Sequence, residues 1–121
     1  MNSAQTLNAF WNGFGLKFYD ENTVPEDAPL PYGTYNVSMS YFDEPVMMSA
    51  SLWYKSQSWA AITEKAMQIG AAIGLGGKII PFDGGRLWIK RGTPFAQRMS
   101  DENEQIRRIY MNVEVEYLSN K

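Results

Sequence analysis

The sequence predicts an α+β domain: a mainly antiparallel sheet backed on one face by two helices, with a β-hairpin and long loops. Two segments place apolar residues at helical spacing, and several others alternate apolar with polar residues as half-buried strands do. Clusters of glycine and proline separate these segments. The chain has 121 residues, near the commonest size of one domain, and contains no internal repeat. We therefore expect residues 1–121 to form a single domain.

The first expected element is a short helix over residues 3–11, with Ser3 as its N-cap. Its apolar face consists of Leu7, Phe10 and Trp11. Glycines at positions 13 and 15 end this helix, and a short strand over residues 16–19 is expected to follow.

A surface loop is expected over residues 20–31. This segment combines acidic side chains with Pro25, Pro29 and Pro31 and has little to bury. A loop of this length is often functional or mobile, and a plain solvated connector is the simpler interpretation.

From Tyr32 onward the apolar pattern has a period of two, which predicts two strands joined by a turn at residues 43–45 as an antiparallel hairpin. The apolar side of the first strand is Tyr35, Val37, Met39 and Tyr41. The second strand has Met48, Ala50, Leu52 and Tyr54 on one side and Ser49, Ser51 and Trp53 on the other.

The main helix follows, with Ser56 or Ser58 as its cap and a glycine-rich stop at residues 74–77. Its apolar stripe is Ile62, Ala66, Ile69 and Ile73. The glycines come after a helix, whereas a phosphate-binding loop follows a strand and opens a helix. Helix termination is therefore the better interpretation of this motif.

The last third predicts a strand over residues 78–82, a tight turn at residues 83–85 and a returning strand over residues 86–91. A polar connector is expected over residues 92–105. The final strand has the clearest alternation, with Ile109, Met111, Val113, Val115 and Tyr117 on its apolar side.

Composition argues against several classes of function. The chain has no cysteine and no histidine, so disulfides, thiolate metal sites and serine–histidine nucleophiles are excluded. We expect no cofactor, and we expect the protein not to be an enzyme. The net charge of −2 lacks the basic footprint of a nucleic-acid binder. No apolar run approaches a membrane span, and the first residues lack signal-peptide features, so a cytoplasmic protein is expected.

Two features favour a role in assembly. Aromatic residues make up 14% of the chain, and they suit either a protein interface or an aromatic-rich core. Trp53 and Trp88 fall on the polar sides of their strands, where a helix, a loop, another subunit or a sugar ligand could cover them. The last third is rich in arginine, whereas residues 20–31 are acidic, which suits head-to-tail contacts between subunits.

Four short stretches of the sequence occur in the same order, and at similar spacing, as in a known family. They are LPYGTY at residues 30–35, SQSWAAI at 56–62, GGRLWI at 84–89 with RGTPF at 91–95, and IRRIY at 106–110. In these stretches the chain resembles the tail-terminator and tail-completion proteins (minor tail or minor capsid proteins) of long-tailed bacteriophages and prophages. The likeness covers most of the chain from about residue 10.

The resemblance implies an α+β fold and a structural virion protein without catalytic residues. It implies a homo-oligomeric ring, usually of six subunits, that caps the tail tube and joins it to the head. The implied partners are therefore the tail-tube protein and the head–tail connector protein. Such a subunit would belong to the virion and assemble in the cytoplasm of the bacterial host.

On this hypothesis the candidate subunit-interface residues lie in the loop over residues 20–31, in the turn at residues 83–86 and the strand after it, and in residues 92–105. They are Pro25, Pro29, Pro31, Asp83, Arg86, Trp88, Pro94, Phe95 and Arg98. Two alternatives remain open: a carbohydrate- or ligand-binding module that uses exposed aromatics, and a small carboxylate-dependent hydrolase with Glu114 and Glu116 among its candidates.

Overall fold

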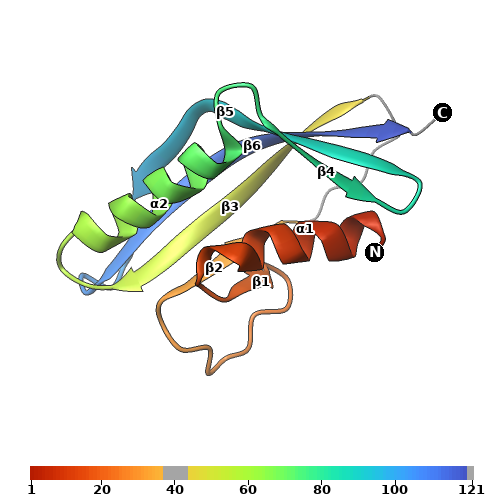
Figure 1. Ribbon diagram of the computed structural model, residues 1–121. Helices are drawn as coiled ribbons and strands as arrows, with labels where there is room; N and C mark the ends of the chain where they lie inside the picture. The colour runs from red at the N-terminus through yellow and green to blue at the C-terminus, as the bar shows by residue number, and fades with distance from the viewer. Residues whose placement is uncertain (37–43, 120–121) are drawn as a thin grey trace.

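The computed structural model describes residues 1–36 and 44–119, and it confirms the α+β class (Figure 1). The helical elements are α1 (Ser3–Trp11), the short 3-10 helix η1 (Asn12–Phe14) and α2 (Ala60–Ile73). The strands are β1 (Phe18–Asp20), β2 (Tyr32–Tyr35), β3 (Pro45–Lys55), β4 (Lys78–Phe82), β5 (Gly85–Met99) and β6 (Ile106–Ser119).

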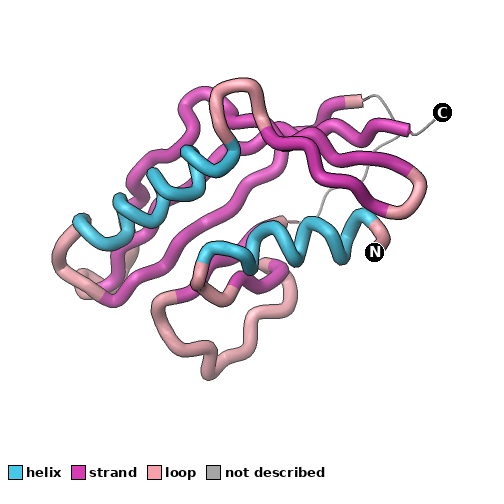
Figure 2. The backbone as a smooth tube through the Cα atoms, viewed as in Figure 1, coloured by secondary structure: helices cyan, strands magenta, loops and turns pink. Residues whose placement is uncertain are grey.

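The strands form one six-stranded sheet in the order β1-β2-β3-β6-β5-β4. Every neighbouring pair is antiparallel except β1 and β2, which are parallel. The C-terminal strand β6 therefore lies inside the sheet, between the two long strands β3 and β5 (Figure 2).

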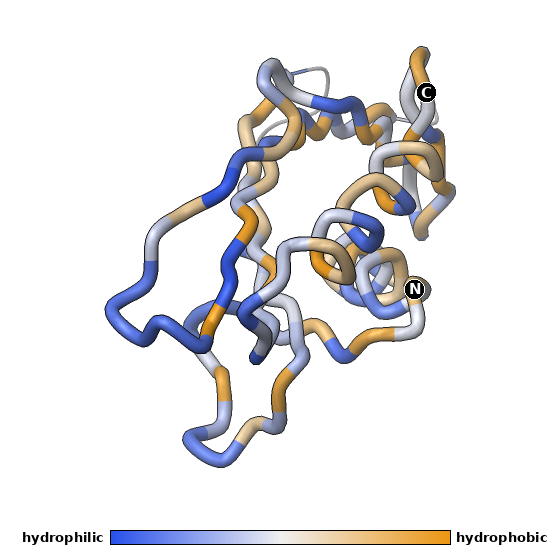
Figure 3. The backbone as a smooth tube through the Cα atoms, turned by 90° about the vertical axis from the view of Figure 1, so that its left-hand side faces the viewer, coloured by the Kyte–Doolittle hydropathy of each residue, from blue (hydrophilic) through white to orange (hydrophobic). Residues whose placement is uncertain are grey.

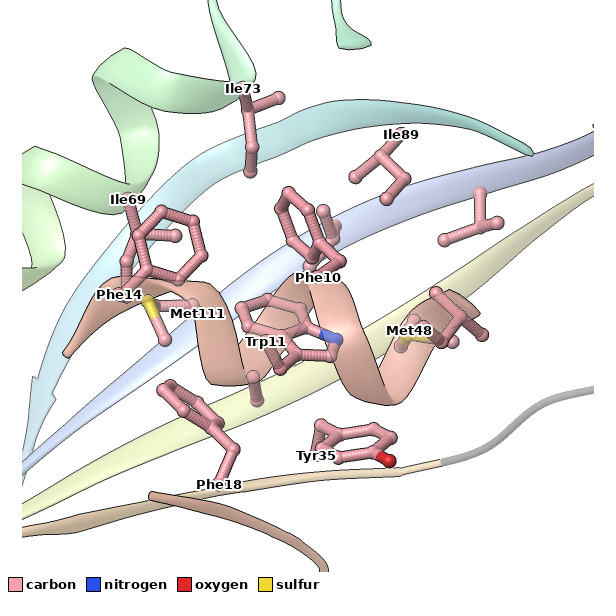
Figure 4. Packing of buried hydrophobic residues seen from close by; sticks show 14 of the residues in the cluster. Phe10, Trp11, Phe14, Phe18, Tyr35, Met48, Ile69, Ile73, Ile89 and Met111 are labelled. Atoms are coloured by element: carbon pink, nitrogen blue, oxygen red, sulfur yellow. The ribbon is translucent and has the colours of Figure 1, made fainter. Parts of the chain in front are cut away.

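Both helices cover the same face of the sheet, as the sequence predicts. The side chains alternate along each strand, so one set faces the helices and forms a single buried cluster. Its centre includes Trp11 of α1, Ile69 of α2 and Met111 of β6 (Figure 4). All five apolar residues predicted for the final strand and all four of the predicted α2 stripe are buried.

The two helices begin differently from the prediction. The N-cap of α1 is Asn2, whose Oδ1 accepts the Gln5 N–H at 2.8 Å, while Gln5 Oε1 accepts the Asn2 N–H at 3.0 Å. This reciprocal capping box replaces the expected Ser3 cap. At α2 the N-cap is Trp59, and Ser58 Oγ instead accepts the Ala60 N–H at 3.1 Å.

The first strand is displaced from residues 16–19 to Phe18–Asp20 because Asn12 fixes its start. Asn12 Oδ1 accepts the Phe18 N–H at 2.9 Å, and its Nδ2 donates to the Phe18 carbonyl at 3.3 Å. The antiparallel pairing of the expected hairpin is confirmed, with Tyr35 opposite Ala50. The continuation of its first strand through Val37, Met39 and Tyr41, and the start of its turn, lie outside the described residues.

The expected polar connector over residues 92–105 is wrong for its first part, because β5 continues to Met99. Residues 92–95 form a bulge opposite the single residue Asn112 of β6, after which regular pairing resumes at Ala96. Asn112 Nδ2 donates to the Pro94 carbonyl at 3.0 Å and fastens the bulge. Proline is tolerated here because a bulge interrupts the ladder that would need its missing N–H.

Among the residues that the structure describes, no helix is long and apolar enough to cross a membrane.

Candidate functional site

The second half of β5 forms an exposed edge of the sheet. The outer neighbour β4 pairs only with residues 85–89 of β5, so in the described chain the outer side of β5 has no strand partner beyond Ile89. Helix α2 runs beside this part of the strand (Figure 1). An open strand edge presents unpaired backbone groups and is a natural site of association.

We call the surface that α2 and this strand make together the α2–β5 edge, and we define it by six side chains. They are Trp59, Met67, Leu75, Arg91, Phe95 and Arg98.

Phe95 joins the strand to the helix. The bulge directs its ring onto α2 at Gly70, where an added Cβ would stand 3.0 Å from Phe95 Cε2. The absence of a side chain at Gly70 therefore lets the ring lie against the helix. Phe95 is half-buried, so part of this aromatic surface remains open to solvent.

Two further apolar side chains of the edge are largely exposed. Met67 is 70% exposed and Leu75 is 97% exposed. Met67 lies off the buried stripe of α2 and Leu75 lies beyond the end of that helix, so burial within the domain does not account for them. Exposed apolar side chains that gather in one place indicate an interaction surface.

Three hollows follow the edge from one end of α2 to the other. The largest, of about 620 Å³, is lined by Gln57, Trp59, Arg98, Met99, Ser100, Asp101, Glu104, Ile106 and Arg107. The second, of about 190 Å³ and mainly apolar, is lined by Thr63, Ala66, Met67, Phe95, Ala96, Gln97, Arg98 and Ile109. The third, of about 340 Å³, is lined by Leu75, Arg91, Gly92, Thr93 and Phe95.

Two arginines flank Trp59 at the end of the edge. The guanidinium carbons of Arg98 and Arg107 lie 4.7 Å and 5.3 Å from its ring centroid, within the range of cation–π attraction. Arg107 also donates to the carbonyls of Glu104 at 2.8 Å and Gln57 at 2.9 Å, so it ties two loops together. Arg98 and Arg91 are exposed and take part in none of the ion pairs found among the described residues.

At the opposite edge of the sheet, beside β1, residues 21–31 form a projecting loop (Figure 1). The Ala28 N–H donates to the Pro25 carbonyl at 3.2 Å and closes a turn, which we call the acidic turn (residues 25–28). Its two central residues, Glu26 and Asp27, are exposed and join no ion pair in the described ranges. Figure 3 shows the hydrophilic end of this loop at the bottom of the molecule.

The candidates from the β4–β5 turn have partners within the chain. Asp83 Oδ2 accepts the N-terminal ammonium of Met1 at 3.0 Å. Trp88 Nε1 donates to the Gly76 carbonyl at 3.0 Å, and the Lys90 ammonium lies 4.1 Å from the centroid of its ring. Arg86 is exposed. The turn precedes the first residue of β5, whereas Arg98 lies near the last, so the turn is separated from the Arg98 end of the α2–β5 edge by most of the strand.

The helix-free face of the sheet carries a second cluster, which we call the aromatic row: Tyr19, Tyr32 and Trp53. Tyr32 lies 5.7 Å from Tyr19 and 6.4 Å from Trp53 between ring centroids. Cations cover both ends, because the Arg108 guanidinium lies 4.4 Å from the Trp53 ring and Lys17 Nζ lies 5.5 Å from the Tyr19 ring.

The paired carboxylates considered for hydrolysis have a common cationic partner. Lys90 Nζ lies 4.0 Å from Glu114 Oε2 and 3.7 Å from Glu116 Oε1 on the helix-free face. The described part of the chain contains no group of three acidic, histidine or cysteine side chains placed to hold a metal ion.

Two tyrosines have shifted ionisation. Burial raises the pKa of the Tyr117 phenol. Burial, and then the negative charge of Glu64, raise the pKa of the Tyr54 phenol. Both raised pKa values favour the neutral phenol, so these two tyrosines lose their protons only at alkaline pH.

The structure thus places Pro94, Phe95 and Arg98 together on one edge and Pro25, Pro29 and Pro31 in or beside the loop at the other. Sequence reasoning did not select Met67 and Leu75 as candidates. Their signal was available: each is an apolar residue that falls off the buried stripe of its helix or beyond its end.

Comparison with protein-family models gives no match for this chain, and comparison with curated proteins gives none either.

Proposed function

We propose that this protein is a structural subunit of a head-to-tail ring, of the kind that terminates the tail tube of a long-tailed bacteriophage and joins it to the head. The observation that carries the association is the chemical difference between the two sheet edges. The α2–β5 edge carries apolar and positively charged side chains, whereas the projecting loop at the opposite edge of the sheet carries acidic ones.

Head-to-tail association requires two different surfaces on one subunit. When each copy uses both surfaces, the contact repeats, and it closes into a ring if the rotation between copies allows closure. Two matching surfaces at opposite edges of one sheet meet this requirement. A two-fold dimer would instead need one patch that is complementary to itself.

The phage assignment rests on the sequence resemblance. It supplies the expected six-fold symmetry, the tail-tube and head–tail connector partners, the place in the virion and the assembly in the bacterial cytoplasm. On this proposal the chain has no catalytic role, and its work is the burial of surface between subunits.

The first test is the mass of the purified protein by light scattering across a wide concentration range, with electron microscopy of the large species. We expect a closed ring with six-fold symmetry. Leu75→Lys and Met67→Lys should weaken association about tenfold or more, because each removes apolar burial worth ~1.5–3 kcal/mol.

A matched control is Ile79→Lys on β4, which replaces another exposed apolar residue at 51% exposure. It should leave the mass unchanged. A protein that stays monomeric throughout, with identical behaviour of all three lysine variants, would contradict the ring proposal.

The aromatic row favours a second candidate function, a carbohydrate- or ligand-binding module. Three adjacent rings on an open sheet face can stack on a ligand without any catalytic residue. This candidate predicts a monomer whose tryptophan fluorescence changes saturably with added oligosaccharide, and Trp53→Ala should abolish the change. No response across a panel of oligosaccharides would remove this candidate.

A further inference from the structure

We propose that the acidic turn of one copy docks into the α2–β5 edge of the next copy, with Glu26 and Asp27 beside Arg98. The inference rests on the proposed self-association and names the contact that would produce it. The site is the mainly apolar hollow of about 190 Å³ between α2 and β5.

Hydrogen bonds within the loop preorganise the acidic turn for such a contact. Besides the bond that closes the turn, the Thr23 N–H donates to the Asp20 carbonyl at 2.9 Å. The Asn22 N–H donates to Asp20 Oδ1 at 2.9 Å. A loop that is already ordered loses less conformational entropy when it binds.

The charges that would meet have no ion-pair partners inside the described chain. Glu26 and Asp27 project from one edge, and Arg98 lies exposed at the other. The sheet order places β1 four strand positions from β5, which is about 19 Å at the usual spacing between strands. The acidic turn would therefore contact the Arg98 side chain of another copy and not that of its own subunit.

The smaller hollow suits the turn better than the larger one on the other side of Arg98. Asp101 and Glu104 line the larger hollow and would repel an acidic segment. No described carboxylate lines the smaller hollow, and its Phe95 and Met67 offer apolar surface to Pro25 and Ala28 of the turn. Arg98 borders both hollows and supplies the positive charge.

The chain has no cysteine, so two single-cysteine variants can report the contact by cross-linking. Ala28→Cys labels the acidic turn and keeps both carboxylates, and Met67→Cys labels the hollow and keeps Arg98. The two variants are mixed, oxidised and separated without reductant. We expect the mixed disulfide to exceed both homodimers and to exceed the control pair of Ala28→Cys with Ile79→Cys by at least about fivefold.

A charge exchange tests the ion pairs themselves. Arg98→Glu alone, and Glu26→Lys with Asp27→Lys, should each lower the yield of the mixed cross-link about tenfold, because like charges then face each other. Arg98→Glu mixed with the double-lysine loop variant should restore it. Arg86→Glu is the matched control, since Arg86 is also exposed but lies in the β4–β5 turn. Circular dichroism confirms that each variant is folded.

The mass of the unmodified protein, measured in parallel, separates this inference from the proposed function. A ring whose mixed cross-link does not exceed the control pair overturns the docking and leaves the ring standing. A monomer with no excess overturns both. A mixed cross-link that exceeds the control pair, falls in the single charge variants and returns in the charge exchange supports the docking, whatever the mass. A mixed cross-link whose yield is the same in all the charge variants overturns the role of Arg98.

Discussion

The two faces of the sheet differ although the same strands build both. On β3, Leu52 is fully buried under the helices, and its neighbour Trp53 lies half-exposed on the other side. On β6, Met111 and Val113 are fully buried, whereas Asn112 and Glu114 between and beyond them face away. The covered face is held by apolar burial, and the helix-free face by contacts among aromatic and charged side chains.

Stability and recognition therefore reside in different parts of this domain. Full burial of a large apolar side chain contributes ~1.5–3 kcal/mol, and its removal adds the cost of a cavity. Exposed ion pairs contribute at most about 1 kcal/mol. Changes to the helix-free face and to the sheet edges should therefore alter contacts with partners more than they alter folding.

The largest expected effect is on the covered face. Met111→Ala should lower the free energy of unfolding by ~2–5 kcal/mol, because Met111 is fully buried and the packed surroundings cannot fill the space. Urea denaturation followed by circular dichroism measures the loss. Glu114→Ala on the other face of the same strand should cost less than about 1 kcal/mol. Equal losses at the two positions would contradict the division between the faces.

Gly33→Ala should have the next largest effect. Gly33 is buried on β2, and an added Cβ would meet the ring of Phe18, which fills the space above it. Displacing this fully buried ring should cost ~1–3 kcal/mol in the same denaturation experiment. Gly13→Ala is the matched control, because no atom of the described residues lies within 4 Å of its added Cβ. A stable Gly33→Ala variant would show that Phe18 can move freely.

Trp53→Ala tests the helix-free face and should cost ~1–2 kcal/mol. It removes the contacts with Tyr32 and Arg108 and the bond from Trp53 Nε1 to Thr34 Oγ1 at 3.3 Å. Thermal unfolding should show a smaller loss than for Met111→Ala. A loss as large as the core variant's would mean that the aromatic row is part of the stabilising core.

The smallest expected effect appears only at alkaline pH. Because burial raises the pKa of Tyr117 in the folded state, the unfolded state loses its phenolic proton first. The contribution of this group is fully present below about pH 10 and is lost as pH rises through the folded pKa. Tyr117→Phe should reduce the fall in unfolding free energy between pH 9 and pH 11. An unchanged pH profile would assign the fall to other groups.

Short-range patterns account for most of what the sequence predicted correctly. The alternation from Ile109 to Tyr117 and the stripe from Ile62 to Ile73 each identify one buried face, and both predictions are confirmed. The extent of β5 was missed because Gly92, Thr93 and Pro94 have the composition of a loop. The α1 cap was misplaced by one residue because Asn2 and Ser3 are both good caps.

The residues of the candidate surfaces were only partly predictable. Phe95 and Arg98 were selected for a segment expected to be a loop, and they lie instead on an open strand edge. Leu75 could have been noted as an apolar residue within a glycine-rich stretch. Its place beside Phe95 depends on how α2 lies against β5. The phage role and the ring remain predictions that rest on the resemblance and on the chemistry of the two edges.

The α+β class, the two helices and the buried sides of β3, of the first part of β5 and of β6 follow from the sequence alone. Periods of two and about 3.6 residues follow from backbone geometry alone, so they can be recognised without any long-range contact. The position of β6 between β3 and β5 is known only from the tertiary structure, as is the lack of a strand partner for β5 beyond Ile89 among residues 1–36 and 44–119. Strand order depends on pairing between residues far apart in the chain, which no local pattern encodes.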